Sequence, residues 1–289
     1  MRVGFLGPAG TFSEQALLSE PSVPPDAELV PLATVHQVVV AVADGDVDRA
    51  LAPIENSLEG SVNEAVDALV HNAHGVRIVG ERVLPVRYCL LARPGMVLQD
   101  VRVVLSHPQG LAQCAAWLRD TLPAAEVRAR TSTAEAVREV AATDDAWAAL
   151  GTPLAGELYG AVTIAEDLGD EPANATRFVW LAREGDTLGD DVAGSDDWKS
   201  SVVFSGDGDG SPGWLVRCLS EFAFRGVNLT RIESRPARRR LGHYVFLLDL
   251  TGRADQPGAA ADAIAALSTH CEELRVLGSY PRAAGAPSG

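Results

Sequence analysis

A repeated alternation of strand-like apolar runs with helix patterns constrains the fold of this chain more than any other feature. Each unit is a short run of Val, Leu, Ile or Phe, then a polar loop, then an amphipathic helix pattern. Four such units follow one another, over residues 3–18, 50–69, 101–118 and 126–142. Repeated units of this kind predict an α/β fold with a mainly parallel sheet.

Polar side chains concentrate in the loops of these units, and a further polar cluster lies near the middle of the chain. Ser, Thr and Asn are the usual helix caps, so one such loop carries no function by itself. The cluster Asn174-Ala175-Thr176-Arg177-Phe178 directly precedes the apolar run Val179–Ala182, which is typical of a buried strand. Ligands of open α/β sheets bind beyond strand ends, and helix N-termini attract anions. The pattern therefore indicates a site for a small, oxygen-rich anion.

A different pattern begins after residue 183. Residues 184–200 are polar, acidic and aperiodic, and we interpret them as a linker. Residues 201–280 predict a strand, a helix, two strands, a helix and a strand, with Ser211 as cap and Pro212 in the first turn of the first helix. The order βαββαβ is that of the ferredoxin-like plan. Residues 281–289 are interpreted as a tail.

Charge and lysine content exclude several classes of function. The formal net charge is −15, so nucleic acid and anionic membranes are not expected partners. Lys199 is the only lysine. This argues against Schiff-base or pyridoxal phosphate chemistry and against a phosphate loop ending in Gly-Lys-Ser/Thr.

Histidine and cysteine spacing gives no convincing metal pattern. His71 and His74, three apart on a predicted helix, are either metal ligands or an exposed helix end. The four cysteines are scattered and are interpreted as reduced core thiols. The N-terminus shows no charged-then-apolar leader, and no apolar run approaches the roughly 20 residues of a membrane span. We expect a cytoplasmic protein without cofactor or metal.

Five short motifs, in a fixed order, carry a resemblance to a known family. They are Gly7–Ser13 (GPAGTFS), Pro53–Gly60 (PIENSLEG), Ser106–Gln109 (SHPQ) with Gln113, Thr176–Phe178 (TRF) and Glu233–Pro236 (ESRP). Together they closely resemble the motifs of prephenate dehydratases, and the resemblance covers essentially the whole chain. It implies the decarboxylating dehydration of prephenate to phenylpyruvate, carbon dioxide and water, in the biosynthesis of L-phenylalanine.

The resemblance also implies a domain organisation. Residues 1–183 would form a two-lobed catalytic domain like periplasmic solute-binding proteins, with lobe 1 at about 1–76 and 162–183 and lobe 2 at about 77–161. Residues 201–280 would form an ACT domain, which senses phenylalanine as an allosteric effector and lowers activity. ACT domains pair, so a homodimer or homotetramer is expected.

The resemblance further implies a set of site residues, with Thr176 as the catalytic hydroxyl. Expected at the substrate are Arg177, Phe178, Asn56, Ser57, Ser106, Gln113, Thr11, Gln109 and Asn174. Expected near the effector are Gly213, Leu215, Val216, Glu233, Ser234 and Arg235. Trp214 stands where the family commonly has alanine, so it either packs in the core or a dimer contact, or changes the effector pocket.

The chemistry of a dianionic substrate suggests separate roles for Thr176 and Arg177. A threonine hydroxyl is too weak an acid to transfer a proton early, so we expect it to donate a hydrogen bond, or relay a proton through water, as the C–O bond breaks. Pairing Arg177 with the ring carboxylate would stabilise the group that must leave, so we expect it on the pyruvyl carboxylate.

Three points stay open in this assignment. Adjacent side chains of a regular strand face opposite ways, so Thr176 and Arg177 share a site only if they precede the regular pairing. Phe178 is either a site residue or core. His107 is either an acid or a helix cap.

Two other functions fit the same motifs. An arogenate dehydratase would act on the aminated form of the substrate. A non-catalytic two-lobed sensor would bind an amino acid without turnover, although the intact Thr176-Arg177-Phe178 argues against it.

Overall fold

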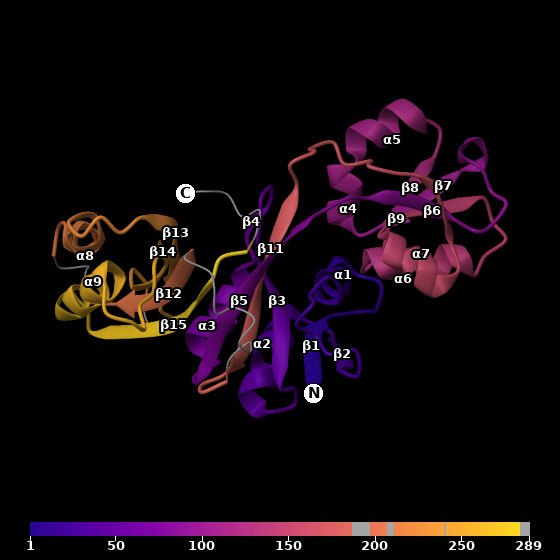
Figure 1. Cartoon of the computed structure of the whole chain (residues 1–289). Helices are drawn as coiled ribbons and strands as arrows, with labels where there is room; N and C mark the ends of the chain where they lie inside the picture. The colour runs from indigo at the N-terminus through magenta and orange to yellow at the C-terminus, as the bar shows by residue number, and fades with distance from the viewer. Residues whose placement is uncertain (187–196, 207–210, 240, 284–289) are drawn as a thin grey trace.

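The computed structural model describes residues 1–186, 197–206, 211–239 and 241–283. The described residues form two α/β lobes and a C-terminal domain, with the first lobe in the middle (Figure 1). No helix in these ranges combines the length and apolar character needed to cross a bilayer.

The first lobe is built on a six-stranded sheet of order β2-β1-β3-β11-β5, with β4 paired to β3. β1 pairs in parallel with β2 and β3, whereas β11 is antiparallel to both β3 and β5. Its elements are β1 (Arg2–Leu6), α1 (Phe12–Leu18), β2 (Glu28–Leu32), α2 (Val35–Asp44), β3 (Arg49–Asn56), β4 (Gly60–Ser61), α3 (Asn63–His71), β5 (Val76–Pro85) and β11 (Ala175–Arg183).

The second lobe is built on a five-stranded sheet of order β10-β6-β9-β7-β8. β7 is parallel to β8 and β9, and β6 is antiparallel to β9 and β10. Its elements are β6 (Cys89–Ala92), η1 (Leu98–Asp100), β7 (Val103–Ser106), α4 (Pro108–Gln113), α5 (Ala115–Thr121), β8 (Glu126–Ala129), α6 (Thr133–Ala141), β9 (Trp147–Gly151), α7 (Pro153–Tyr159) and β10 (Val162–Ala165).

The boundaries between the lobes differ from those expected, because two strands belong to the other sheet. Val76–Pro85 pairs with β11 in the first sheet, and Val162–Ala165 pairs with β6 in the second. The chain therefore crosses between the lobes at residues 86–88 and 166–174, rather than near 77 and 162. Strand pairing over almost 100 residues is not visible in local sequence patterns.

The C-terminal domain has the predicted βαββαβ order. It comprises β12 (Trp198–Ser205), α8 (Trp214–Ala223), β13 (Leu229–Pro236), β14 (Tyr244–Thr251), α9 (Ala259–Leu267), η4 (Ser268–His270) and β15 (Glu273–Pro281). Its antiparallel sheet has the order β13-β14-β12-β15, as the ferredoxin-like plan requires. β12 begins at Trp198 and so includes the last three residues of the expected linker. Residues 187–196 of that linker and 284–289 of the expected tail lie outside the described residues.

Two serines that lie just before helices do not cap them, and one of these is the expected cap Ser211. Ser61 lies in β4, and its hydroxyl contacts Glu233 and accepts from Arg231 Nη2 at 2.5 Å, so it does not cap α3. At α8 the cap position is Gly213, whose φ of +78° is left-handed, rather than Ser211. The contacts of Ser61 come from β13 of the C-terminal domain, which a local cap pattern does not include.

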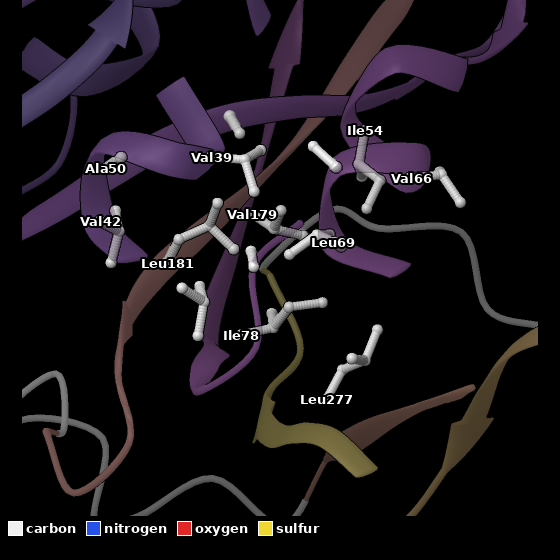
Figure 2. Packing of buried hydrophobic residues seen from close by; sticks show 14 of the residues in the cluster. Val39, Val42, Ala50, Ile54, Val66, Leu69, Ile78, Val179, Leu181 and Leu277 are labelled. Atoms are coloured by element: carbon white, nitrogen blue, oxygen red, sulfur yellow. The ribbon is translucent and has the colours of Figure 1, made fainter. Parts of the chain in front are cut away.

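A single apolar core joins the first lobe to the C-terminal domain. Figure 2 shows Ile78 of β5, Val179 and Leu181 of β11 and Leu277 of β15 in this cluster. Val203, Val245 and Leu247 of the C-terminal sheet are buried in it as well. Full burial of one such side chain stabilises a fold by about 1.5–3 kcal/mol, so one face of the C-terminal sheet is firmly held against the first lobe. α8 and α9 cover its other face.

Candidate active site

Thr176 lies at the end of the first sheet where the chain returns from the second lobe. It is the second residue of β11, opposite Asn56 at the end of β3 and Leu84 near the end of β5. The ends of β3 and β5 therefore lie beside the start of β11, where the chain returns from the second lobe; Figure 1 shows these three strands side by side.

Four uncharged side chains form a hydrogen-bonded chain that ends on the Thr176 hydroxyl. Asn56 Nδ2 lies 3.0 Å from both Thr176 Oγ1 and Asn174 Oδ1, and Asn174 Nδ2 donates to Gln113 Oε1 at 2.8 Å. The three amide side chains are 4–9 % exposed. Gln113 comes from α4, so both lobes contribute to the chain. The Thr176 hydroxyl accepts a hydrogen bond from Asn56 and, within the described residues, donates none. Its own hydrogen can therefore be donated to a ligand.

The loop around Ser57 holds this arrangement in place. Asn56 Oδ1 accepts from the N–H groups of Leu58 and Glu59, at 2.9 and 3.1 Å. Ser57 Oγ accepts from the N–H of Ala175 at 3.0 Å, and Ser57 N–H donates to the Ala175 carbonyl at 2.9 Å. Gln113 Nε2 donates to Glu59 Oε1 at 3.4 Å, which ties the same loop to α4.

Three other expected site residues make structural contacts instead of joining this chain. Ser106 is fully buried and donates to the Leu150 carbonyl at 2.9 Å. Thr11 Oγ1 donates to the Leu6 carbonyl and caps α1. Gln109 lies in the first turn of α4, where its N–H donates to His107 Nδ1 at 3.3 Å, so His107 is the helix cap.

Arg177 points away from the Thr176 group, toward the C-terminal domain. Both residues lie within the regular pairing of β11 with β5, so their side chains leave opposite faces of the sheet. The partners of the guanidinium, among the described residues, are the side chains of Glu55, Glu81, Asp249 and Tyr280. The expected pairing of Arg177 with the pyruvyl carboxylate is therefore not the contact that the structure shows.

The environment of Arg177 keeps both it and Asp249 charged. Burial by itself would lower the pKa of Arg177, but Asp249, Tyr280 and Glu81 together outweigh burial and raise the pKa well above its usual value. Burial would raise the pKa of Asp249, but Arg177 and Arg231 hold it below its usual value. Phe178, next in the chain, is 1 % exposed and packs with Phe5 in the core.

The two lobes together match a known family. A family model described as prephenate dehydratase matches residues 3–186. The chain belongs to the prephenate dehydratase family. It is accordingly an enzyme of the hydro-lyase class, which removes water and carbon dioxide from prephenate.

Relatives extend this family assignment over nearly the whole chain. A prephenate dehydratase of Mycolicibacterium vanbaalenii is 41 % identical over 96 % of this chain and 90 % of its own. The solved prephenate dehydratase of Arthrobacter aurescens, in complex with L-Phe, is 38 % identical with a TM-score of 0.87, covering 100 % of this chain and 92 % of that one. A solved structure described as GqqA, a quorum quenching acylase, is 30 % identical with a TM-score of 0.85, over 99 % of both chains.

The expected effector residues of this prephenate dehydratase family member fall into two places. Gly213, Leu215 and Val216 line a cavity of about 370 Å³ together with Tyr244 and Phe246. Trp214 lines it too, and its indole N–H donates to the His270 carbonyl at 2.7 Å, so it packs within the domain.

Glu233 and Arg235 lie against the first lobe instead. Arg235 binds the Asp67 carboxylate through two hydrogen bonds of 2.7 and 2.9 Å, and Glu233 contacts Ser61. Ser234, between them on β13, pairs with Phe246 of β14 and faces the other side of the sheet. Within one chain the two halves of the expected effector site are therefore apart.

Sequence reasoning missed the partners of Arg177. Asp249 interrupts the apolar run Val245–Leu250, and Lys199 is the only lysine of the chain. A charged residue inside an apolar strand signals a buried partner, because an unpaired charge is rarely buried. His71 and His74 belong to no group of three or more metal-ligating side chains in the described ranges.

Proposed function

We propose that Thr176 is the group that assists the loss of hydroxide from the prephenate ring. The reaction breaks the bond between the ring and its carboxylate, and this electron pair completes the aromatic ring. The C–O bond to the ring hydroxyl breaks at the same time, and the leaving oxygen must gain a proton to become water. The observation that supports the role is the Thr176 hydroxyl, which accepts from Asn56 and has its own hydrogen available.

The neutral surroundings of Thr176 suit this chemistry. Asn56, Asn174 and Gln113 supply amide groups without a charge. A cation on the ring carboxylate would stabilise the group that has to leave and slow the reaction. We propose that Asn56, Ser57, Gln113 and Asn174 orient the substrate, whereas Ser106, Thr11 and Gln109 shape the loops that carry them.

Turnover of prephenate by the full chain tests the function, with phenylpyruvate as the product measured. Thr176→Ala should lower kcat by about 10²–10⁴ while substrate still binds, and Thr176→Ser should keep part of the activity. An alanine variant with the kcat of the wild type would exclude the role of the hydroxyl. Comparing kcat/KM for prephenate and arogenate separates the two dehydratases, and a non-catalytic sensor would show no turnover. The relative described as an acylase is a reason to measure the reaction directly.

We also propose that the C-terminal domain is an ACT domain that binds L-phenylalanine and lowers activity, and that the two lobes bind substrate between them as in periplasmic solute-binding proteins. The cavity beside Gly213, Leu215 and Val216 supports the first point, as does the L-Phe complex of the Arthrobacter aurescens relative. Exposed apolar side chains at Val216 and Phe224 are available to a second copy, in line with a homodimer or homotetramer. Two measurements test the effector: calorimetric titration with L-phenylalanine, and the rate of prephenate turnover at increasing L-phenylalanine. The absence of binding heat together with an unchanged rate would contradict the proposal.

A further inference from the structure

Four buried charged side chains lie at the junction of the first lobe and the C-terminal domain. The first lobe contributes Arg177 from β11 and Glu81 from β5, and the C-terminal domain contributes Lys199 from β12 and Asp249 from β14. Their side chains are 11 %, 0 %, 8 % and 2 % exposed. The two positive and two negative charges balance, which buried charges require.

Contacts across the domain boundary hold Arg177 from two directions. Arg177 Nη1 donates to Asp249 Oδ2 at 2.6 Å, and Nη2 donates to the Tyr280 hydroxyl at 3.0 Å. On the side of the first lobe, Nε donates to Glu81 Oε2 at 2.7 Å. Lys199 Nζ donates to both oxygens of Glu81, at 3.0 and 3.1 Å, so the C-terminal domain holds Glu81 as well.

The partners of Arg177 are themselves fixed by hydrogen bonds. The Ser201 hydroxyl donates to Asp249 Oδ1 at 2.5 Å and lies 2.7 Å from the Tyr280 hydroxyl. Both Asp249 and Tyr280 are almost completely buried. The guanidinium is therefore bound by a rigid part of the C-terminal sheet and not by mobile surface groups.

The segment Thr176-Arg177 is paired regularly with β5 on one side, but on the other side it lies next to an irregularity in the pairing with β3. The register between β11 and β3 shifts between Arg177 and Phe178, directly after Arg177. A side-chain anchor at Arg177 fixes this short segment, because Thr176 and Arg177 share one peptide unit. An error of about 1 Å in the position of a catalytic group can reduce a rate by roughly 10²-fold.

We propose that Arg177 is a positioning residue through which the C-terminal domain, by way of Asp249 and Tyr280, fixes the Thr176 hydroxyl against Asn56. The catalytic strand is then complete only when the C-terminal sheet is docked. This inference rests on the proposed role of Thr176.

The structure separates this role from that of a substrate ligand. A guanidinium that binds substrate must reach the face of the sheet on which Thr176 Oγ1 meets Asn56 Nδ2. Arg177 occupies the other face, where its hydrogen bonds are made to protein groups. Loss of a substrate ligand raises KM, whereas loss of a positioning residue lowers kcat and leaves KM in place.

The experiment measures kcat and KM for prephenate in the full-length Asp249→Asn, Tyr280→Phe and Arg177→Met variants. We expect Asp249→Asn and Arg177→Met to lower kcat roughly 10–100-fold with KM within about twofold of the wild type. Tyr280→Phe keeps the ring and all charges and removes one hydrogen bond to Arg177, so a smaller loss of kcat at unchanged KM is expected. If the charge variants do not fold, as judged by circular dichroism, Tyr280→Phe decides alone.

Asp67→Asn is the matched control. It makes the same chemical change in another carboxylate that binds an arginine across the same domain boundary, the Asp67–Arg235 pair, away from β11. Its kcat without effector should equal that of the wild type.

The inference would be overturned by a rise in KM with kcat retained in Arg177→Met, or by wild-type kcat in every folded variant of the set. Equal losses in Asp67→Asn and Asp249→Asn would overturn it as well, because any weakened docking would then have the same effect. A wild-type protein that does not turn over prephenate would instead refute the proposed function.

Discussion

Replacing Asn56 by aspartate tests the chemistry of the site with the smallest change in shape. The substitution keeps the oxygen that accepts from Leu58 and Glu59 N–H, so the loop is retained. It replaces the NH₂ group, which lies 3.0 Å from Thr176 Oγ1 and 3.0 Å from Asn174 Oδ1, by a second oxygen. Three oxygens would then meet at a side chain that is 7 % exposed.

The expected effect of Asn56→Asp follows from the reversal of this donor. The Thr176 hydroxyl would turn and donate its hydrogen to the new carboxylate, so the hydrogen would no longer be available to the leaving oxygen. We expect kcat to fall by about 10²–10⁴, as for loss of the hydroxyl itself. Each buried group left without a partner also costs about 1–3 kcal/mol, so the free energy of unfolding should fall by a similar amount.

The pH dependence of the variant gives the sharper result. Burial beside other oxygens raises the pKa of the new carboxyl group, because it disfavours the charged form. As the pH falls through that raised pKa, the group becomes an O–H donor and can again donate to Thr176 Oγ1. Activity of Asn56→Asp should therefore rise toward acid relative to wild type in a pH profile of kcat. Asn72→Asp, at an exposed asparagine, is the control. Wild-type kcat at neutral pH in Asn56→Asp would refute the reasoning.

Two further predictions concern the contacts between domains and between lobes. The hydrogen bond from Arg235 lowers the pKa of Asp67 below its ordinary value of 3.8, so this pair stabilises the fold above that pH and the contribution is lost as the pH falls through the lowered pKa. Asp67→Asn should thus lose about 1 kcal/mol of unfolding free energy at neutral pH and nothing in strong acid, measured by urea titration; a loss independent of pH would contradict it. Gly10→Ala places a Cβ 3.0 Å from Ala155 Cβ at a φ of +88°, whereas Gly75→Ala has a φ of +83° and no neighbour within 4 Å. Backbone strain should lower the free energy of unfolding of both variants by roughly 1–2 kcal/mol. Gly10→Ala should lose more than Gly75→Ala, because its new Cβ also presses on the second lobe; equal losses would contradict this.

The sequence allowed the order of the elements to be predicted where the periodic pattern was strong. The βαββαβ order of the C-terminal domain and the strand–loop–helix units of the two lobes are present in the structure. The pair β2 and α2 was missed, although Thr34 caps α2 and its stripe Val35, Val38, Val39 and Val42 is buried. Pro31 lies within β2 and argues against a central strand; β2 is an edge strand, where proline is tolerated.

Contacts between distant segments were the part that sequence patterns could not supply. Val76–Pro85 joins the first sheet because β11 pairs with it, and that pairing depends on the fold of the second lobe between them. Two of the partners of Arg177, Asp249 and Tyr280, come from strands 72 and 103 residues further along the chain. A charge within an apolar strand indicates that a partner exists but does not identify it.

The three consecutive residues Thr176, Arg177 and Phe178 suggested a shared site because they are adjacent in the sequence. Adjacent side chains of a strand point to opposite faces of the sheet. In the structure the three residues accordingly have three different surroundings. The Thr176 hydroxyl meets amide groups from both lobes, the Arg177 guanidinium meets buried carboxylates of two domains, and the Phe178 ring packs in the core of the first lobe. Each neighbour therefore constrains the backbone of Thr176 from a different side. One short segment can therefore combine the proposed catalytic hydroxyl, a domain contact and core packing without three side chains touching one ligand.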